Sequence, residues 1–146
     1  MKKIIIKDWI LECDVDATRK AYQEIKVGSA EDCGCIYCRN FSPLRDELFQ
    51  GEILKFLRKL GINYEKEAET YHKGTLDNDK HLYGLWFHSI GRIIENGSPI
   101  KFENGLLVYF LEQGNLRHNI FAEEKLIQVE IDNAILPWVL DKLPNE

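Results

Sequence analysis

The first third of the chain carries one strand-like and one helical pattern of apolar residues. From Lys3 to Cys13, branched apolar residues recur at short intervals and predict a strand. Asp14 or Asp16 then provides an N-cap for a helix to about Lys26, because an aspartate oxygen accepts hydrogen bonds from the free amides of the first turn. Apolar residues on one face of this helix would contact the core: Ala17, Ala21, Tyr22 and Ile25.

A second helix is predicted after a loop that spans Ser29 to Phe41. Ser42-Pro43 is a typical helix start, because serine caps the first turn and proline needs no hydrogen-bond partner there. Gly61 ends this helix in a left-handed conformation, and Gly51 is a candidate break inside it. The buried stripe is expected to comprise Leu48, Phe49, Ile53, Phe56, Leu57 and Leu60.

From Asn63 onward, aromatic and branched residues separated by tight turns predict a series of hairpins. The expected strands are 65–74, 81–95, 106–113, 116–121 and 126–132, and a short final helix is expected near Pro137. In the last strand Ile127, Val129 and Ile131 would face the core and the residues between them would face water.

Two early helices followed by hairpins predict an α+β fold in which the helices pack on a mostly antiparallel meander sheet. The apolar share of 45% and the charged share of 29% are those of a folded globular protein. No repeat or linker divides the sequence, so residues 1–146 are expected to form a single globular domain.

Charge and hydropathy limit the classes of partner. A net charge of −5 argues against a general nucleic-acid-binding protein, which would show a basic face. The apolar stretch in Met1–Asp8 is too short for a signal peptide, and none is long enough to cross a bilayer. We therefore expect a cytoplasmic protein with reduced thiols and with neither a nucleic-acid nor a membrane partner.

Three cysteines within six residues, Cys33, Cys35 and Cys38, are the main candidates for chemistry. The two-residue gap between Cys35 and Cys38 lets a tight turn direct two soft thiolates at one zinc ion, and Cys33 would be a third ligand. Cys13 is the favoured fourth ligand, ahead of the histidines His72, His81, His88 and His118. Zinc is the only cofactor to which the sequence points.

Two other interpretations of the cysteines stay open. The thiols would serve redox or nucleophilic catalysis if Arg39 favours the thiolate of Cys38 and a strand histidine acts as base. Thioredoxin-like pairs, however, begin a helix after a strand, whereas a loop between helices is expected here. Alternatively, the cysteines pack as small apolar residues, an interpretation that we weigh equally with metal binding.

Other polar residues are expected to have structural roles. His81 and His88 are seven positions apart, so in an uninterrupted strand they face opposite sides and do not form one site. Glu65, Glu67 and Glu69 share one face of a strand and are expected to form a solvated edge that discourages aggregation.

The segment Glu31–Phe41, with its C-G-C-x-Y-C-R-N-F pattern, resembles a family of small, mostly bacterial proteins of uncharacterised function. Leu60-Gly-Ile62 and His81-Leu-Tyr-Gly84 extend the resemblance over most of the chain. It implies a single cytosolic domain and assigns no catalytic residue.

The sequence thus favours a small cytosolic binding or interaction module with a cysteine-cluster loop, held by a structural zinc site and serving a protein partner of unknown identity. The absence of a complete catalytic signature leads us to favour this module over an enzyme. The alternative is a small thiol-dependent enzyme, redox or nucleophilic, that uses Cys33, Cys35 and Cys38.

Overall fold

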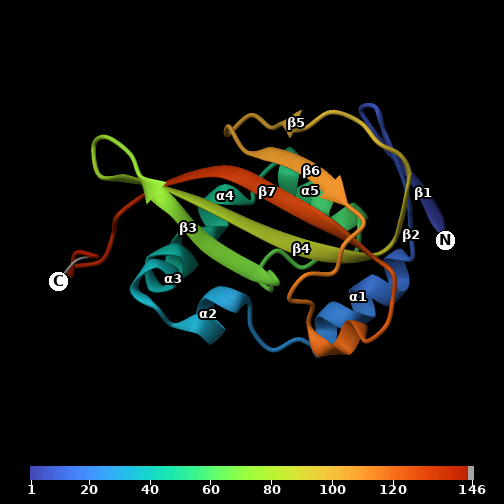
Figure 1. The fold of residues 1–146 in the computed structure, drawn as a ribbon, viewed down its shortest axis with the longest axis horizontal. Helices are drawn as coiled ribbons and strands as arrows, with labels where there is room; N and C mark the ends of the chain where they lie inside the picture. Colours follow the sequence, from blue (N-terminus) through green and yellow to red (C-terminus); the bar gives the residue numbers. More distant parts are fainter. Residues whose placement is uncertain (145–146) are drawn as a thin grey trace.

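The computed structural model describes residues 1–144 and is organised around one long strand, β4 (Lys80–Glu95). Strand β7 (Leu126–Pro137) pairs with one edge of β4 along most of its length. On the other edge, β3 (Glu69–Thr75) pairs with the first half of β4 and β2 (Trp9–Cys13) pairs with the second half. All three pairings are antiparallel, so β4 forms the centre of the sheet (Figure 1).

The remaining strands extend the sheet at both sides. β1 (Lys2–Ile6) pairs with β2, while β6 (Leu107–Leu111) and β5 (Ile100–Lys101) lie beyond β7. The order is β1-β2-β4-β7-β6-β5, with β3 beside β4, and every pairing is antiparallel. The expected α+β class with early helices on a mostly antiparallel sheet is confirmed.

Five short α-helices and two 3-10 turns complete the described chain. In chain order they are α1 (Val15–Glu24), α2 (Ser29–Cys33), α3 (Ile36–Phe41), η1 (Ser42–Leu44), α4 (Arg45–Leu48), α5 (Glu52–Lys59) and η2 (Asn119–Phe121). Aromatic contacts join the early helical region to the sheet at ring-centroid distances near 5.6 Å, through the pairs Phe41–Tyr83, Phe49–Phe87 and Phe56–Phe110. Burial of these rings supplies the main drive for helix–sheet packing.

The side chains of β4 that alternate with Tyr83 and Phe87 meet the segment between β6 and β7. Trp86 donates from Nε1 to the carbonyl oxygen of Asn115 at 3.0 Å, and the ring of His88 lies 6.1 Å from that of Phe121. Gln128 of β7 is buried and accepts from the Asn115 amide of this segment at 3.0 Å, and the buried Glu130 accepts from Gln128 at 2.6 Å. The expectation that they would face water is therefore wrong.

Local rules explain where several elements begin and end. Asp14 caps α1, accepting from the Ala17 amide at 3.1 Å, as one of the two candidate aspartates was expected to do. The predicted helix from Ser42 to Leu60 is divided into η1, α4 and α5, with Gly51 at the break at a φ of +64°. Gly61 follows α5 at a φ of +83°, the left-handed conformation expected there.

Four predicted elements are wrong. The single strand 3–13 is a hairpin, because Lys7 adopts a φ of +52° and reverses the chain. The loop 29–41 forms α2 and α3. Residues 116–121 form no strand but end in η2, and residues 138–144 form no helix after Pro137. Instead β7 is longer than expected, and Trp138 packs on His81 with their rings 4.8 Å apart.

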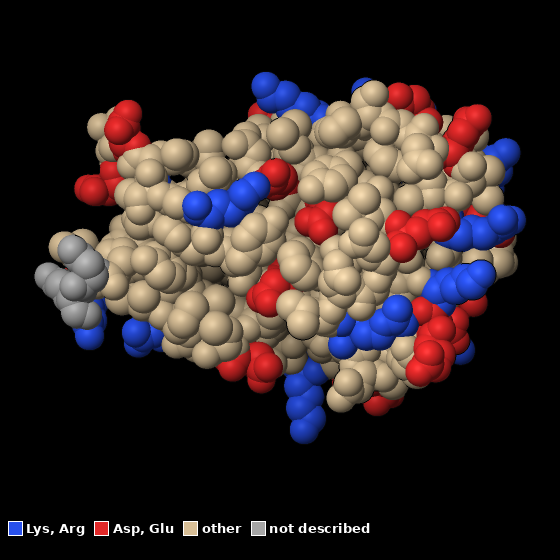
Figure 2. Space-filling model, viewed as in Figure 1, with Lys and Arg blue, Asp and Glu red and all other residues tan. Residues whose placement is uncertain are grey.

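Acidic and basic residues are mixed along the sequence. Figure 2 shows acidic and basic side chains interspersed on one face of the molecule, without an extended region of a single sign. Within the described residues, no helix has the length and apolar character needed to cross a membrane.

Candidate metal-binding site

The three clustered cysteines surround the turn between α2 and α3. Cys33 is the last residue of α2, and Gly34 follows in the left-handed conformation, with a φ of +67°. The Gly34 amide donates to the carbonyl oxygen of Ala30 at 3.1 Å and closes α2. Cys35 is the N-cap of α3, and Cys38 lies in its first turn. Two helix ends thus position all three side chains.

The thiols of these three cysteines converge. Their Sγ atoms all lie within 4.8 Å of one another. Cys38 is buried, whereas Cys33 and Cys35 are exposed, so the group has one inner and two outer sulfur atoms. The Sγ of Cys35 also accepts a hydrogen bond from the Cys38 amide at 3.4 Å. The predicted loop is therefore a pair of short helices, and the predicted convergence of these three thiols is confirmed.

The outer thiol of Cys35 and the inner thiol of Cys38 have different environments, which shift their pKa values in opposite directions. Burial acts to raise the pKa of Cys35, but hydrogen bonds from the Cys38 amide and from the neighbouring thiols outweigh it and lower that pKa below its usual value. Burial and the adjacent sulfur atoms of Cys35 and Cys33 raise the pKa of Cys38 well above the usual range. Cys35 is thus the thiol that ionises more readily of these two.

Cys13 lies outside this group. It ends β2, where it is paired with Gly91 of β4 and is fully buried. Burial raises the pKa of its thiol to about 11, despite a hydrogen bond with Ser89. The cluster lies instead at α2 and α3, toward the opposite end of the sheet (Figure 1). The structure therefore gives no support to Cys13 as the fourth ligand.

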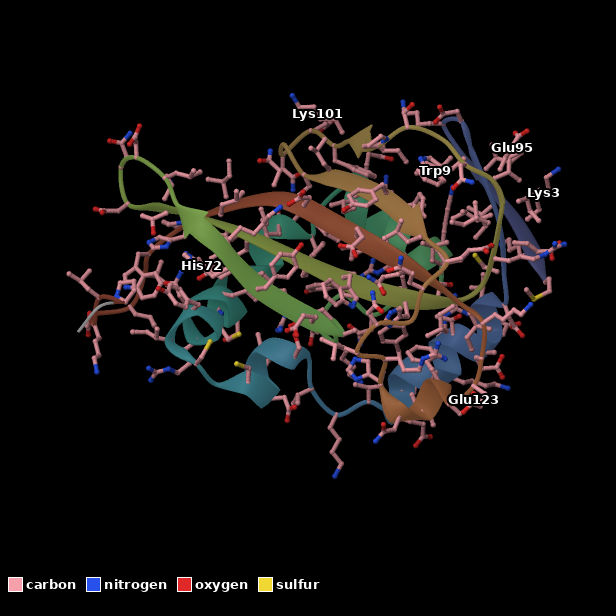
Figure 3. All side chains as sticks on the ribbon, in the orientation of Figure 1. Lys3, Trp9, His72, Glu95, Lys101 and Glu123 are labelled. Atoms are coloured by element: carbon pink, nitrogen blue, oxygen red, sulfur yellow. The ribbon has the colours of Figure 1, made fainter. Side chains whose placement is uncertain are left out.

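The histidines do not join the sulfur group either. His72 and His81 meet across β3 and β4, with Nε2 and Nδ1 2.8 Å apart. His72 stacks on Tyr37, at a centroid distance of 4.0 Å, and Figure 3 shows it beside α3. His88 bonds Gln128 at 3.2 Å, and His118 lies 3.3 Å from the Lys66 carbonyl oxygen. The tyrosine between Cys35 and Cys38 thus links the cysteine turn to the histidine pair.

Hydrogen bonds fix α3 against the sheet and the C-terminal segment. The hydroxyl of Tyr83 donates to the carbonyl oxygen of Tyr37 at 2.8 Å. The buried amide group of Asn40 donates to Pro137 at 3.1 Å and accepts from the amide of Val139 at 2.7 Å. Since these contacts hold both ends of the cysteine turn's second helix, they limit the movement of Cys38.

A buried carboxylate holds the start of α2. Glu67 accepts hydrogen bonds from the Ala30 amide at 2.9 Å and the Ser29 hydroxyl at 3.1 Å. Its charge is balanced by Arg45, which also binds Glu31. The expectation that Glu67 belongs to a solvated edge is wrong, because its side chain is entirely buried. The alternation of Glu65, Glu67 and Glu69 resembles an exposed strand face, so the sequence offered no signal for this role.

Chemically, the turn offers soft donors that suit zinc and other thiophilic ions. Cys33, Cys35 and Cys38 form the one group of three or more close Cys, His, Asp or Glu ligand atoms within residues 1–144. A tetrahedral structural site requires a fourth donor, so the three thiolates would provide an incomplete set. The arrangement can also bring two thiols together for oxidation to a disulfide.

Comparisons with known proteins identify no relatives for this arrangement: no family model matches the chain, and no curated protein or solved structure matches it. The resemblance of segment 31–41 to a family of small bacterial proteins stays a prediction.

Proposed function

We propose that the protein is a small cytosolic binding module whose cysteine turn holds a zinc ion and contributes to the recognition of a protein partner. The observation that carries this proposal is the convergence of three Sγ atoms within 4.8 Å. Nearby thiolates repel one another unless a cation or protons separate them, and zinc is a cation that thiolates bind strongly.

The spacing of the sulfur atoms supports a zinc site. With Zn–S bonds of about 2.3 Å, the sulfur atoms of a tetrahedral site lie about 3.8 Å apart. The thiols of Cys33, Cys35 and Cys38 would need to close by about 1 Å at most, which side-chain rotation supplies. The ion would then tie together α2 and α3, two helices too short to be stable alone.

The incomplete ligand set supports a binding role. Cys38 forms the inner corner, and the exposed Cys33 and Cys35 form the outer corners, so the fourth position of a bound ion would face solvent. Closed four-ligand sites are structural, whereas a three-ligand site leaves a position for water or an incoming donor. We propose that a side chain of the partner occupies it.

Metal analysis of the protein, purified without chelator and under reducing conditions, tests the proposal. We expect one zinc ion per chain, with strong loss in Cys35→Ser and Cys38→Ser. Cys13→Ser is the matched control, because it makes the same substitution outside the sulfur group and should retain zinc. A metal-free protein whose stability does not change on adding zinc would rule out the zinc site.

A thiol-dependent enzyme is the second candidate, favoured by one specific contact. Cys35 is exposed, and its Sγ accepts from the Cys38 amide at 3.4 Å, a bond that stabilises a thiolate. The nearby Cys38 could form a disulfide with it. This candidate predicts that metal-free protein shows rapid alkylation of Cys35 below pH 8, whereas uniformly slow labelling of all four cysteines would exclude it.

A further inference from the structure

A row of half-buried aromatic side chains crosses the outer face of the sheet, which is the face opposite α4 and α5 (Figure 1). Trp86 of β4 lies directly opposite Glu130 of β7, which in turn lies opposite Tyr109 of β6. Residues that pair directly across antiparallel strands point to the same face. Phe110, the neighbour of Tyr109, points to the other face and packs on Phe56 of α5. Figure 2 shows uncharged side chains over most of the middle of the outer face, with separate carboxylates among them.

A fourth strand adds Tyr71 to this row. Tyr71 of β3 is paired with Gly84 of β4, and a Cβ at Gly84 would overlap the hydroxyl end of the Tyr71 ring. The ring therefore lies across β4 and points toward β7, with its centroid 5.7 Å from that of Trp86. Burial raises the pKa of Tyr71 and of Tyr109, and the negative charge of Glu130 adds to both shifts. Three aromatic side chains thus surround the carboxylate of Glu130.

Glu130 is a buried residue whose carboxylate has one oxygen atom without a partner. The residue is only 7% exposed, and within residues 1–144 its carboxylate accepts one hydrogen bond, from Gln128 to Oε1 at 2.6 Å. Oε2 accepts none from this part of the chain, but it is not among the enclosed polar atoms there, so it remains open to solvent. A buried charge is costly unless a cation or several hydrogen bonds compensate for it. Oε2 is therefore a free acceptor in an apolar setting.

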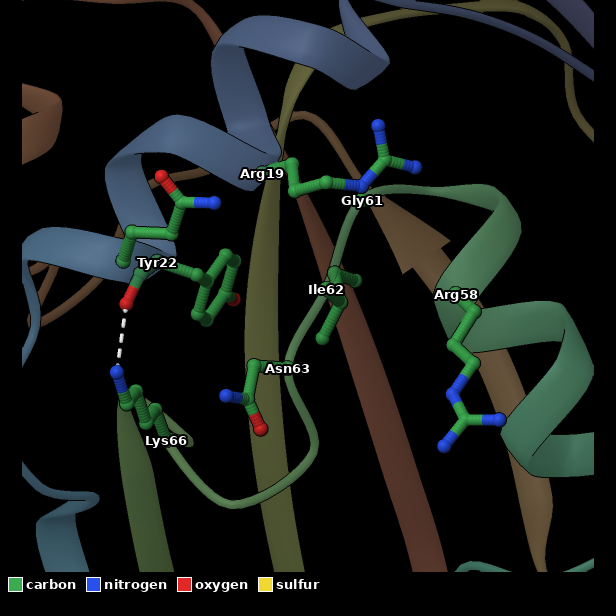
Figure 4. Close-up of a pocket in the computed structure, with 8 residues that line it drawn as sticks. Arg19, Tyr22, Arg58, Gly61, Ile62, Asn63 and Lys66 are labelled. Carbon is green, nitrogen blue, oxygen red and sulfur yellow. Dashed lines mark hydrogen bonds between the residues drawn. The ribbon is translucent and has the colours of Figure 1, made fainter.

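The cations of the neighbouring segments have other partners. Lys73 of β3 pairs with Asp132 at 2.7 Å, and Arg117 donates to two backbone carbonyl groups of the loop that precedes β7. Lys66, just before β3, donates to a carbonyl oxygen of α1 at 2.8 Å, the bond drawn as a dashed line in Figure 4. Glu69 of β3 is a further carboxylate on the outer face. Since no cation within residues 1–144 forms an ion pair with the buried carboxylate, this face offers negative charge that a ligand can neutralise.

We propose that the outer face binds an arginine side chain of a partner protein, with the guanidinium group stacked on the aromatic rings and donating to Oε2 of Glu130. The hydroxyl groups of Tyr71 and Tyr109 form no hydrogen bond within residues 1–144, so they are further acceptors. A guanidinium group suits this set because it carries five N–H donors in one plane and stacks on aromatic faces. A lysine ammonium group is more strongly hydrated, and a quaternary ammonium group has no N–H for the carboxylate. The proposal does not depend on the zinc site.

An NMR titration of the full-length protein with a blocked glycine–arginine–glycine tripeptide tests this inference. The chain has three tryptophans, and the indole N–H group of each donates to a backbone carbonyl oxygen. We expect a saturable shift of the Trp86 indole signal, while the signals of Trp9 and Trp138 serve as internal controls and stay in place. The matching tripeptide with lysine should bind more weakly. Equal affinity for the two peptides would overturn the assignment to arginine.

Glu130→Gln should weaken binding of the arginine peptide at least about tenfold, the loss expected for one charge-assisted hydrogen bond. Glutamine keeps an oxygen atom for the bond from Gln128 and removes a buried charge, so the melting temperature should not fall. Glu95→Gln is the matched control, because it removes the same charge at the exposed far end of β4 (Figure 3). It should change the affinity less than about twofold.

Two results would overturn the proposal. One is the absence of a saturable shift of the Trp86 indole signal with millimolar arginine peptide. The other is equal weakening by Glu130→Gln and Glu95→Gln, because binding would then follow the net charge of the protein and not the buried carboxylate.

Discussion

The guanidinium group of Arg45 lies 2.8 Å from the carboxylate of Glu67, and their side chains are only 6% and 0% exposed. The 2.8 Å distance joins Nη2 of Arg45 to Oε1 of Glu67, and its angles are not those of a hydrogen bond. The same nitrogen atom donates a hydrogen bond to Oε2 of Glu67 at 3.1 Å. Glu31 of α2 approaches the same guanidinium group to 2.6 Å. One buried cation thus connects α4 with the start of the cysteine turn and with the segment before β3.

Arg45→Met is expected to destabilise the protein by about 3–5 kcal/mol, because it leaves the buried carboxylate of Glu67 without a counter-charge. Urea denaturation measures the loss. Lys55→Met is the control: Lys55 pairs with Glu52 at 3.5 Å, but both side chains are about 70% exposed, so the loss should stay below about 0.5 kcal/mol. Similar losses in both variants would show that the buried pair has no special role.

Gly61 combines a left-handed backbone with a close helix contact. Its φ is +83°, and a Cβ there would lie 2.5 Å from the carbonyl oxygen of Val15 in α1. Gly51 has a similar φ of +64° but open space around it. We therefore expect Gly51→Ala to cost about 1 kcal/mol for backbone strain and Gly61→Ala clearly more. Thermal unfolding of the two variants compares strain alone with strain plus steric overlap, and equal losses would contradict the close contact.

Features set by short stretches of sequence were predictable. The cap by Asp14, the break at Gly51 and the left-handed Gly61 each depend on a few neighbouring residues. The proximity of Cys35 and Cys38 has the same origin, because a two-residue gap at a helix start confines both thiols to one turn.

Features that depend on distant partners were not predictable. Glu67 is buried because Arg45 and the amide of Ala30 meet it, and nothing in its own neighbourhood indicates them. Gln128 alternates with apolar residues as a solvent-facing residue would, yet the segment before β7 covers it and donates to it from the Asn115 amide at 3.0 Å. Cys13 was grouped with the cluster because it is a cysteine at the end of the first strand, before a helix that could return the chain, but sheet pairing places it elsewhere.

Zinc addition to metal-free, reduced protein is expected to raise the melting temperature by at least about 5 °C, since binding to the folded state alone adds roughly 2 kcal/mol at saturating metal. The gain should disappear in a Cys35→Ser/Cys38→Ser double variant and persist in Cys13→Ser. Differential scanning calorimetry with and without zinc measures it. An equal gain in the double variant would assign the metal to another site.

Stability is expected to depend on the protonation of His88. This side chain is fully buried, with Nε2 bonded to Gln128 and with no partner for Nδ1 among residues 1–144. Burial, helped by the charges of Arg117 and His118, lowers its pKa to about 4, although the bond to Gln128 opposes the shift. The folded protein therefore holds a neutral imidazole at pH values where the unfolded chain is already protonated.

Between pH 6.5 and about 4 the unfolded chain binds more protons at His88 than the folded protein does. The free energy of unfolding therefore carries no penalty from His88 above pH 6.5. It falls by up to about 3 kcal/mol as the pH decreases through this window. Burial also raises the pKa of Glu130, which has the opposite effect on stability. His88→Gln retains Glu130, so the difference between the two proteins isolates the histidine. Urea denaturation at pH 7, 6, 5 and 4 should give a steeper decline for the wild type, and parallel curves would show that His88 is not held neutral.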